Sequence, residues 1–155
     1  SVMAGGDKKA FETCNKIFES YSKSYKFMGS SGSGQLTKMV NQICIAGLIQ
    51  ALAEGMYFSS KAGLNTADVM DVITKGAAQS WQMENRWETM LNDKYDFGFA
   101  VDLMRKDLDI VLRQAKKMDA ELEITDLVNS FYKEIQNSGG GSRDTSSLLK
   151  RIQEK

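Results

Sequence analysis

The sequence of 155 residues is 42% hydrophobic and 26% charged, the balance of an ordinary globular domain with one hydrophobic core. Its 20 basic residues equal its 20 acidic residues, and a net charge of zero argues against a face that binds nucleic acid. The absence of histidine excludes serine–histidine and cysteine–histidine catalysis and removes the commonest metal ligand, so we expect no metal site.

The most apolar stretch of the sequence is interrupted by polar residues at Lys38, Asn41, Gln50 and Glu54. We therefore expect no segment that spans a membrane. A signal peptide is not expected either, because no basic segment precedes an apolar stretch with a cleavage site. Two isolated cysteines at apolar helical positions indicate reduced thiols and a cytoplasmic protein.

The first predicted elements are the end of a β-strand and a helix. Residues 1–4 are short and apolar and stop at a pair of glycines, which is typical of a strand end. Asp7 is expected to cap a helix. The apolar side chains of that helix recur at helical spacing and are Phe11, Cys14, Ile17, Phe18 and Tyr21.

One long helix is predicted next, from about residue 35 to about residue 62. A helix of this length spans about 40 Å, the width of a small domain. It is apolar over most of its circumference, so we expect it to be central, with neighbours packed closely around it. Gly63 is expected to end it, and Asn65 or Thr66 to cap the following helix.

The rest of the sequence keeps the helical period. Further helices are predicted at 66–76, 81–90, 99–118 and 124–135. Residues 138–142 resemble a linker, after which Asp144 or Thr145 is expected to begin a last amphipathic helix. The sequence therefore predicts an all-α domain of about seven helices around one long central helix.

The stretch at residues 29–34, with the sequence GSSGSG, has two interpretations. Glycine and serine form any flexible connector between helices. Alternatively, glycines allow backbone N–H groups to approach an anionic ligand at a helix N-terminus. A dinucleotide fingerprint would require these glycines to follow a strand inside a βαβ unit, whereas helices are predicted on both sides. The chain alone thus has no evident site for a nicotinamide cofactor.

Lys38, Asn41 and Gln42 share one face of the long helix, just past its first turn. Such residues usually form a solvated stripe. Here, however, their apolar neighbours leave little of the helix free for water. A partly buried lysine near the positive end of a helix should have a lowered pKa, toward the range useful for proton transfer.

The pattern Gly29-x-x-Gly32-x-Gly34-x-x-x-Lys38-x-x-Asn41 resembles the catalytic-helix motif of the β-hydroxyacid dehydrogenases. This family includes 3-hydroxyisobutyrate dehydrogenase, tartronate semialdehyde reductase and 6-phosphogluconate dehydrogenase. Three further segments resemble the family in the same order, at residues 3–7, 99–115 and 144–148. The resemblance implies a C-terminal helical domain at 7–155, like that of 6-phosphogluconate dehydrogenase. Residues 1–6 would be the end of a missing N-terminal domain that binds NAD or NADP.

The resemblance also implies roles for residues of the long helix. Lys38 would be the general acid/base that handles the hydroxyl proton while hydride passes between substrate and cofactor. Asn41, with Gly32 and Ser33, would hold the substrate. The 6-phosphogluconate branch has its asparagine four residues after the lysine, where Gln42 stands here. We therefore favour a small 3-hydroxy acid or its semialdehyde over a sugar phosphate.

Phe99, Lys106 and Asp107 are the expected cofactor contacts. Phe99 and Lys106 are seven residues apart and so would share a helical face. The resemblance implies that they lie beside the nicotinamide end of the cofactor. Lys106 would contact the cofactor, and Asp107 would support the site. The alternative is a core phenylalanine beside a surface charge pair that contributes little. Gln82, Met83 and Arg86, on the helix at 81–90, are candidates for substrate specificity.

A second function stays open, a non-catalytic helical module for oligomerisation or binding. The long apolar helix suits a homo-oligomer, and family members associate through this domain. An interaction module has no reason to direct Lys38, Asn41 and Lys106 into one cleft, so their convergence would distinguish the two. Glyoxylate and succinic semialdehyde reduction also stay open, whereas Lys38 counts against imine reduction. The sequence fixes neither the acid, nor NAD over NADP, nor the oligomeric number.

Overall fold

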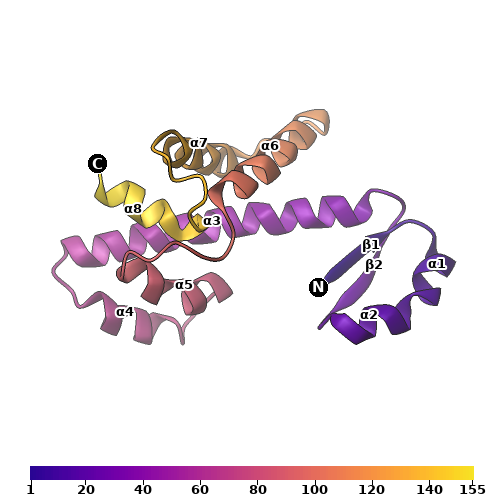
Figure 1. The fold of residues 1–155 in the computed structure, drawn as a ribbon, viewed down its shortest axis with the longest axis horizontal. Helices are drawn as coiled ribbons and strands as arrows, with labels where there is room; N and C mark the ends of the chain where they lie inside the picture. The colour runs from indigo at the N-terminus through magenta and orange to yellow at the C-terminus, as the bar shows by residue number, and fades with distance from the viewer. The chain divides into compact units, whose positions relative to one another are not determined.

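The computed structural model describes all residues, 1–155, and divides into two compact units, Ser1–Gln42 and Ile43–Lys155. Most of the chain is helical, as predicted, and helix α3 (Ser33–Lys61) continues through the limit between the units (Figure 1). The predicted domain limit after residue 6 lies inside the first unit.

The first unit begins with two parallel strands joined by two short helices. These elements are β1 (Val2–Gly5), α1 (Lys8–Thr13), α2 (Asn15–Tyr21) and β2 (Tyr25–Gly29). The strand end at residues 1–4 is confirmed, as is the Asp7 cap, whose carboxylate accepts a 2.8 Å hydrogen bond from the Ala10 N–H. The predicted first helix is interrupted at Cys14, which ends α1 and begins α2.

Strand β2 corrects the expectation of an all-α chain. Its side chains alternate, with Tyr25 and Phe27 half-buried and Lys26 and Met28 exposed. The ring centroids of Tyr25 and Phe27 lie 6.1 and 5.5 Å from that of Phe11 on α1. This aromatic cluster holds the helices against one face of the sheet. Helices therefore do not flank residues 29–34 on both sides, because a strand precedes them.

Helix α3 is buried along one side rather than around its circumference. Ala46, Ile49 and Ala53 are fully buried, whereas Leu48 is 43% and Phe58 72% exposed. By length and composition α3 is long and apolar enough to cross a membrane, with an 18-residue window of mean hydropathy 1.3, so the four polar residues do not interrupt it as strongly as expected. The core helix of a globular domain meets the same criterion, and the buried side of α3 belongs to the core of the second unit.

The remaining helices follow the predicted order with small shifts at their ends. They are α4 (Thr66–Ile73), α5 (Trp81–Leu91), α6 (Val101–Lys117), α7 (Glu123–Asn137) and α8 (Leu148–Gln153), the last preceded by a 3-10 turn at Thr145–Ser147. Side chains of Asn65 and Ser80 cap α4 and α5, and Gly63 ends α3 with φ +73°.

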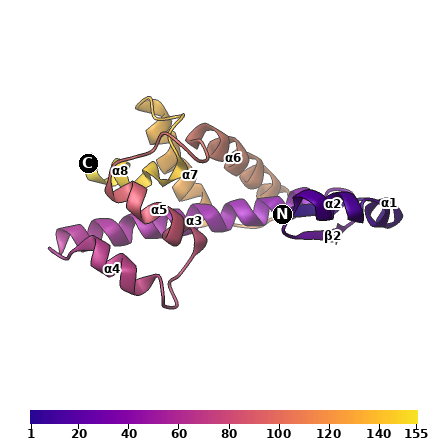
Figure 2. The same cartoon turned by 60° about the horizontal axis from the view of Figure 1, so that its bottom comes forward.

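The core of the second unit lies between these helices and the part of α3 from Ile43 onward. In both views α6 and α7 lie side by side, on the opposite side of this part of α3 from α4 (Figures 1 and 2). The buried side chains that they share with α8 are Met104, Leu108, Val128, Tyr132, Ile135, Leu148 and Leu149.

Candidate functional site

The glycine-rich stretch forms a tight turn from strand β2 into helix α3. A Cβ atom on Gly5 would lie 2.6 Å from the Ser30 carbonyl oxygen, and one on Gly34 would collide with the Met3 carbonyl oxygen. These two glycines therefore allow the backbone of β1 to touch the start of α3. Gly32 has φ +94°, which favours glycine, and the space beside it is open.

This turn differs from a flexible connector and from a complete dinucleotide fingerprint. The glycines follow a strand and open a helix, as a fingerprint requires. No strand follows α3, however, so the helix does not lead to a further parallel strand. Gly34 serves packing within the chain, whereas a Cβ atom on Gly32 would meet nothing within 4 Å.

One turn into α3, two side chains converge on the amide of Gln42. The Lys38 Nζ and the Asn41 Nδ2 each donate a 2.8 Å hydrogen bond to the Gln42 Oε1. Gln42 is only 2% exposed, whereas Lys38 is exposed. The expected partial burial of Lys38 is therefore wrong, and the buried member of the cluster is a residue that the sequence interpretation left out of the site.

The Lys38 ammonium carries three N–H donors, and Gln42 accepts from one of them. An amine that is held at one point and open to solvent can give a proton to a substrate oxygen or take one from it. Asn41 brings a second polar group next to the amine. Ser33, at the first position of α3, is half-buried beside Gly32.

The predicted cofactor contacts lie at the start of α6. Phe99 is half-buried against the core and precedes the helix, so its spacing from Lys106 does not by itself place both residues on one helical face. Lys106 is 62% exposed, and its Nζ lies 3.3 Å from the Asp107 carboxylate, whose side chain is 19% exposed. The structure thus shows the charge pair of the alternative interpretation, with a mostly exposed lysine, and the contact with a cofactor stays a prediction.

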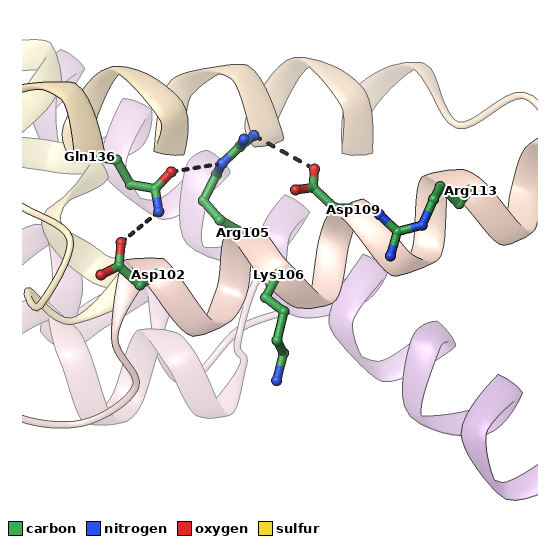
Figure 3. Close-up of a pocket in the computed structure, with 6 residues that line it drawn as sticks. All are labelled: Asp102, Arg105, Lys106, Asp109, Arg113 and Gln136. Atoms are coloured by element: carbon green, nitrogen blue, oxygen red, sulfur yellow. Dashed lines mark hydrogen bonds and ion pairs between the residues drawn. The ribbon is translucent and has the colours of Figure 1, made fainter.

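Lys106 also borders a shallow polar pocket of about 290 Å³ (Figure 3). Within it Gln136 donates to Asp102 and accepts from the Arg105 Nε at 3.0 Å, and the Arg105 guanidinium lies 3.8 Å from Asp109. Figure 3 shows Lys106 pointing away from this chain of contacts. Its ammonium is therefore not held by the polar groups that line the pocket.

Lys38 and Asn41 belong to the first unit, and Phe99, Lys106 and Asp107 belong to the second. Convergence of the two sets in one cleft stays a prediction. Arg86, one of the three specificity candidates, forms an ion pair within the second unit, where its Nε lies 3.2 Å from the buried Asp144 carboxylate.

Comparison with known proteins gives concordant matches. Residues 32–152 match the family described as NAD-binding of NADP-dependent 3-hydroxyisobutyrate dehydrogenase. An uncharacterized oxidoreductase of Shewanella frigidimarina is 53% identical over 99% of this chain and 53% of its own length. The 2-hydroxy-3-oxopropionate reductase of Escherichia coli is 33% identical over 99% of this chain and 52% of its own length.

Solved structures agree. The crystal structure of 3-hydroxyisobutyrate dehydrogenase from Salmonella typhimurium superposes with a TM-score of 0.87 and 29% identity, over 96% of this chain and 52% of that one. The chain thus spans about half the length of the curated relatives that it matches.

Proposed function

The chain belongs to the NAD-binding 3-hydroxyisobutyrate dehydrogenase family, and we propose that it is the helical part of an oxidoreductase acting on a small 3-hydroxy acid or its semialdehyde. The observation that carries this proposal is the cluster of Lys38, Asn41 and Gln42, one turn beyond the open Gly32 turn and inside the matched region. The names of two relatives support the substrate class, because each denotes a carboxylic acid with an oxygen on carbon 3.

In this proposal Lys38 moves the proton of the reaction. During oxidation the neutral amine takes the proton from the substrate hydroxyl, and during reduction the ammonium returns a proton to the carbonyl oxygen. Gln42 Oε1 holds the Nζ during both steps. Asn41, with Gly32 and Ser33, orients the substrate.

NAD or NADP, when bound, supplies the hydride chemistry. Lys106, with a mostly exposed side chain, and the half-buried ring of Phe99 would hold its nicotinamide end. Asp107 would keep the Lys106 side chain in place through their 3.3 Å contact. Most of the cofactor would be bound by sequence outside this chain. Because parallel strands are typical of nucleotide-binding domains, we place the limit of the helical part at the turn between β2 and α3.

The direct test is Lys38→Ala in the full-length protein. Turnover should first be found with a panel of 3-hydroxy acids and semialdehydes and both cofactors. Removal of a general acid/base should then lower kcat by about 10²–10⁴-fold, with NAD(P)H affinity retained. Lys61→Ala removes a lysine at the other end of the same helix and should leave turnover unchanged. Undiminished turnover in Lys38→Ala would refute the assignment.

The isolated chain provides a second check. Because most of the cofactor site would lie elsewhere, residues 1–155 alone should show no measurable dehydrogenase activity. Tight binding of NAD or NADP to this chain in calorimetry would contradict the proposed division of the site.

A non-catalytic helical module is the second candidate function. The exposed side chains of Leu48 and Phe58 on α3 favour it, because large exposed apolar side chains are common at interfaces between subunits. We propose that the protein is a homo-oligomer in either case, which analytical ultracentrifugation can check. If no substrate of the panel gives turnover with either cofactor, the purely interactive function is the better account.

A further inference from the structure

A buried carboxylate joins the end of the chain to the start of α6. Asp144 is fully buried, and its Oδ2 accepts a 2.9 Å hydrogen bond from the Phe99 N–H. Its Oδ1 accepts from the Ser146 N–H at 3.1 Å and from the Ser146 Oγ at 2.6 Å. Both carboxylate oxygens thus accept hydrogen bonds, and one of these bonds comes from the backbone of Phe99.

Arg86 supplies the countercharge. Its Nε lies 3.2 Å from Asp144 Oδ1, and its guanidinium lies near two aromatic rings, 5.1 Å from the centroid of Trp81 and 5.0 Å from that of Phe97. Rings at these distances stabilise the cation and hold it in place. Because a buried charge without its partner is strongly destabilising, Asp144 and Arg86 depend on each other.

The backbone around Phe99 is held on its other side too. The Thr145 N–H donates to the Phe99 carbonyl at 3.0 Å, and the Val101 N–H donates to the Arg143 carbonyl at 2.9 Å. No side chain caps the N-terminus of helix α6. Its first two N–H groups donate instead to the carbonyl groups of Arg143 and Gly141, in the segment at residues 141–145 that precedes α8. The segment at residues 141–145 therefore fixes where α6 begins.

Gly98 shows how closely the carboxylate approaches this turn. Its φ is +76°, and a Cβ atom there would collide with Asp144 Oδ2 and lie 3.2 Å from an Arg86 Nη2. A side chain at position 98 would displace the ion pair, the turn or both.

We propose that Asp144 and Arg86 are positioning residues that fix the backbone of Phe99 for contact with the nicotinamide cofactor. The inference rests on the proposed function, in which Phe99 and Lys106 meet the cofactor. Because the same contacts set the start of α6 at Val101, they also set the position from which Lys106, five residues into the helix, extends.

The test uses Asp144→Asn and Gly98→Ala in the full-length protein. Asparagine keeps the size of the side chain but has only one acceptor oxygen. It therefore cannot accept hydrogen bonds both from the Phe99 N–H and from the donors of Arg86 and Ser146. Alanine at position 98 disturbs the same turn while leaving both charges present. Hydrogen exchange in peptides covering 97–102 should become about tenfold faster in both variants. The Kd for NAD(P)H, from fluorescence titration, should rise about tenfold, with a matching rise of the cofactor KM and a much smaller change in kcat.

Glu134→Gln is the matched control. This change breaks the ion pair between Glu134 on α7 and Arg151 on α8, whose atoms lie 2.8 and 3.0 Å apart. That ion pair does not contact the turn at Phe99. This variant should leave both the exchange at 97–102 and the Kd unchanged. If Asp144→Asn does not fold, Gly98→Ala and Arg86→Lys decide the matter.

Faster exchange with an unchanged Kd, or unchanged exchange, would overturn the inference. A full-length wild-type protein that does not bind NAD(P)H would refute both the inference and the proposed function. Normal NAD(P)H binding together with undiminished turnover in Lys38→Ala would refute only the proton-transfer role, and the positioning of Phe99 could still be judged from the Kd.

Discussion

The hydroxyl of Tyr132 on α7 allows a quantitative test of how the core is built. The side chain is fully buried, and its Oη donates a 3.2 Å hydrogen bond to the Thr145 carbonyl. Burial, and secondarily the negative charge of Asp144, raise the pKa of Tyr132 well above its ordinary value. The perturbation is Tyr132→Phe, which removes the hydroxyl and keeps the ring.

The sign of the effect depends on pH. At pH 7 the variant should be less stable by about 1 kcal/mol, the net contribution of one hydrogen bond. Above about pH 10 the unfolded wild-type chain loses the Tyr132 proton and the folded chain keeps it, so wild-type stability falls by up to about 1.4 kcal/mol per pH unit. Phenylalanine has no proton to lose. The two stabilities should therefore become equal between about pH 10.5 and 11 and then reverse in order.

Urea denaturation of both proteins at intervals from pH 7 to pH 11 measures this difference. Burial also raises the pKa of Tyr95, but that residue is present in both proteins and its effect cancels. Val128→Ala, a buried change on the same helix without a titrating group, should give a stability difference that does not vary over this range. A constant difference between wild type and Tyr132→Phe up to pH 11 would refute the reasoning.

Two further predictions concern α3. Gln42→Leu should lower kcat by about tenfold or more, because the Lys38 Nζ loses the acceptor that holds it. Gln50→Leu, at a buried glutamine two turns later, should leave kcat unchanged, and equal kcat values in the two variants would contradict the role of Gln42. Gly34→Ala should destabilise the protein by about 1–3 kcal/mol, because its Cβ would meet the Met3 carbonyl. Gly47→Ala, where a Cβ meets nothing within 4 Å, should stabilise it by about 0.5–1 kcal/mol in thermal unfolding.

The helices were predictable because their signals are local. Apolar spacing and capping residues such as Asp7 and Asn65 lie within each helix or directly beside it, and the structure confirms them within a few residues. Strand β2 was missed because it is five residues long and its partner β1 lies more than 20 positions earlier, beyond the reach of a periodic pattern. The alternation of Tyr25 and Phe27 was the one local signal for it.

The candidate site was predictable only in part, for the same reason. The face shared by Lys38, Asn41 and Gln42 follows from helical spacing, but which of the three is buried depends on packing that the pattern does not contain. The position of Phe99 outside α6 could not be predicted either. The first N–H groups of that helix are satisfied by carbonyls some 40 residues later, so no neighbouring residue marks its start.

The pairing of β1 with β2 decides where this protein can be divided for production in pieces. A cut between Gly6 and Asp7 would remove β1 and leave β2 with a bare hydrogen-bonding edge, a surface that recruits strands from other molecules. A cut after Gly29 removes both strands together. Either cut uncovers the backbone at Gly34, which β1 covers, so only the fate of β2 separates them. The soluble fragment to seek therefore begins at the turn into α3.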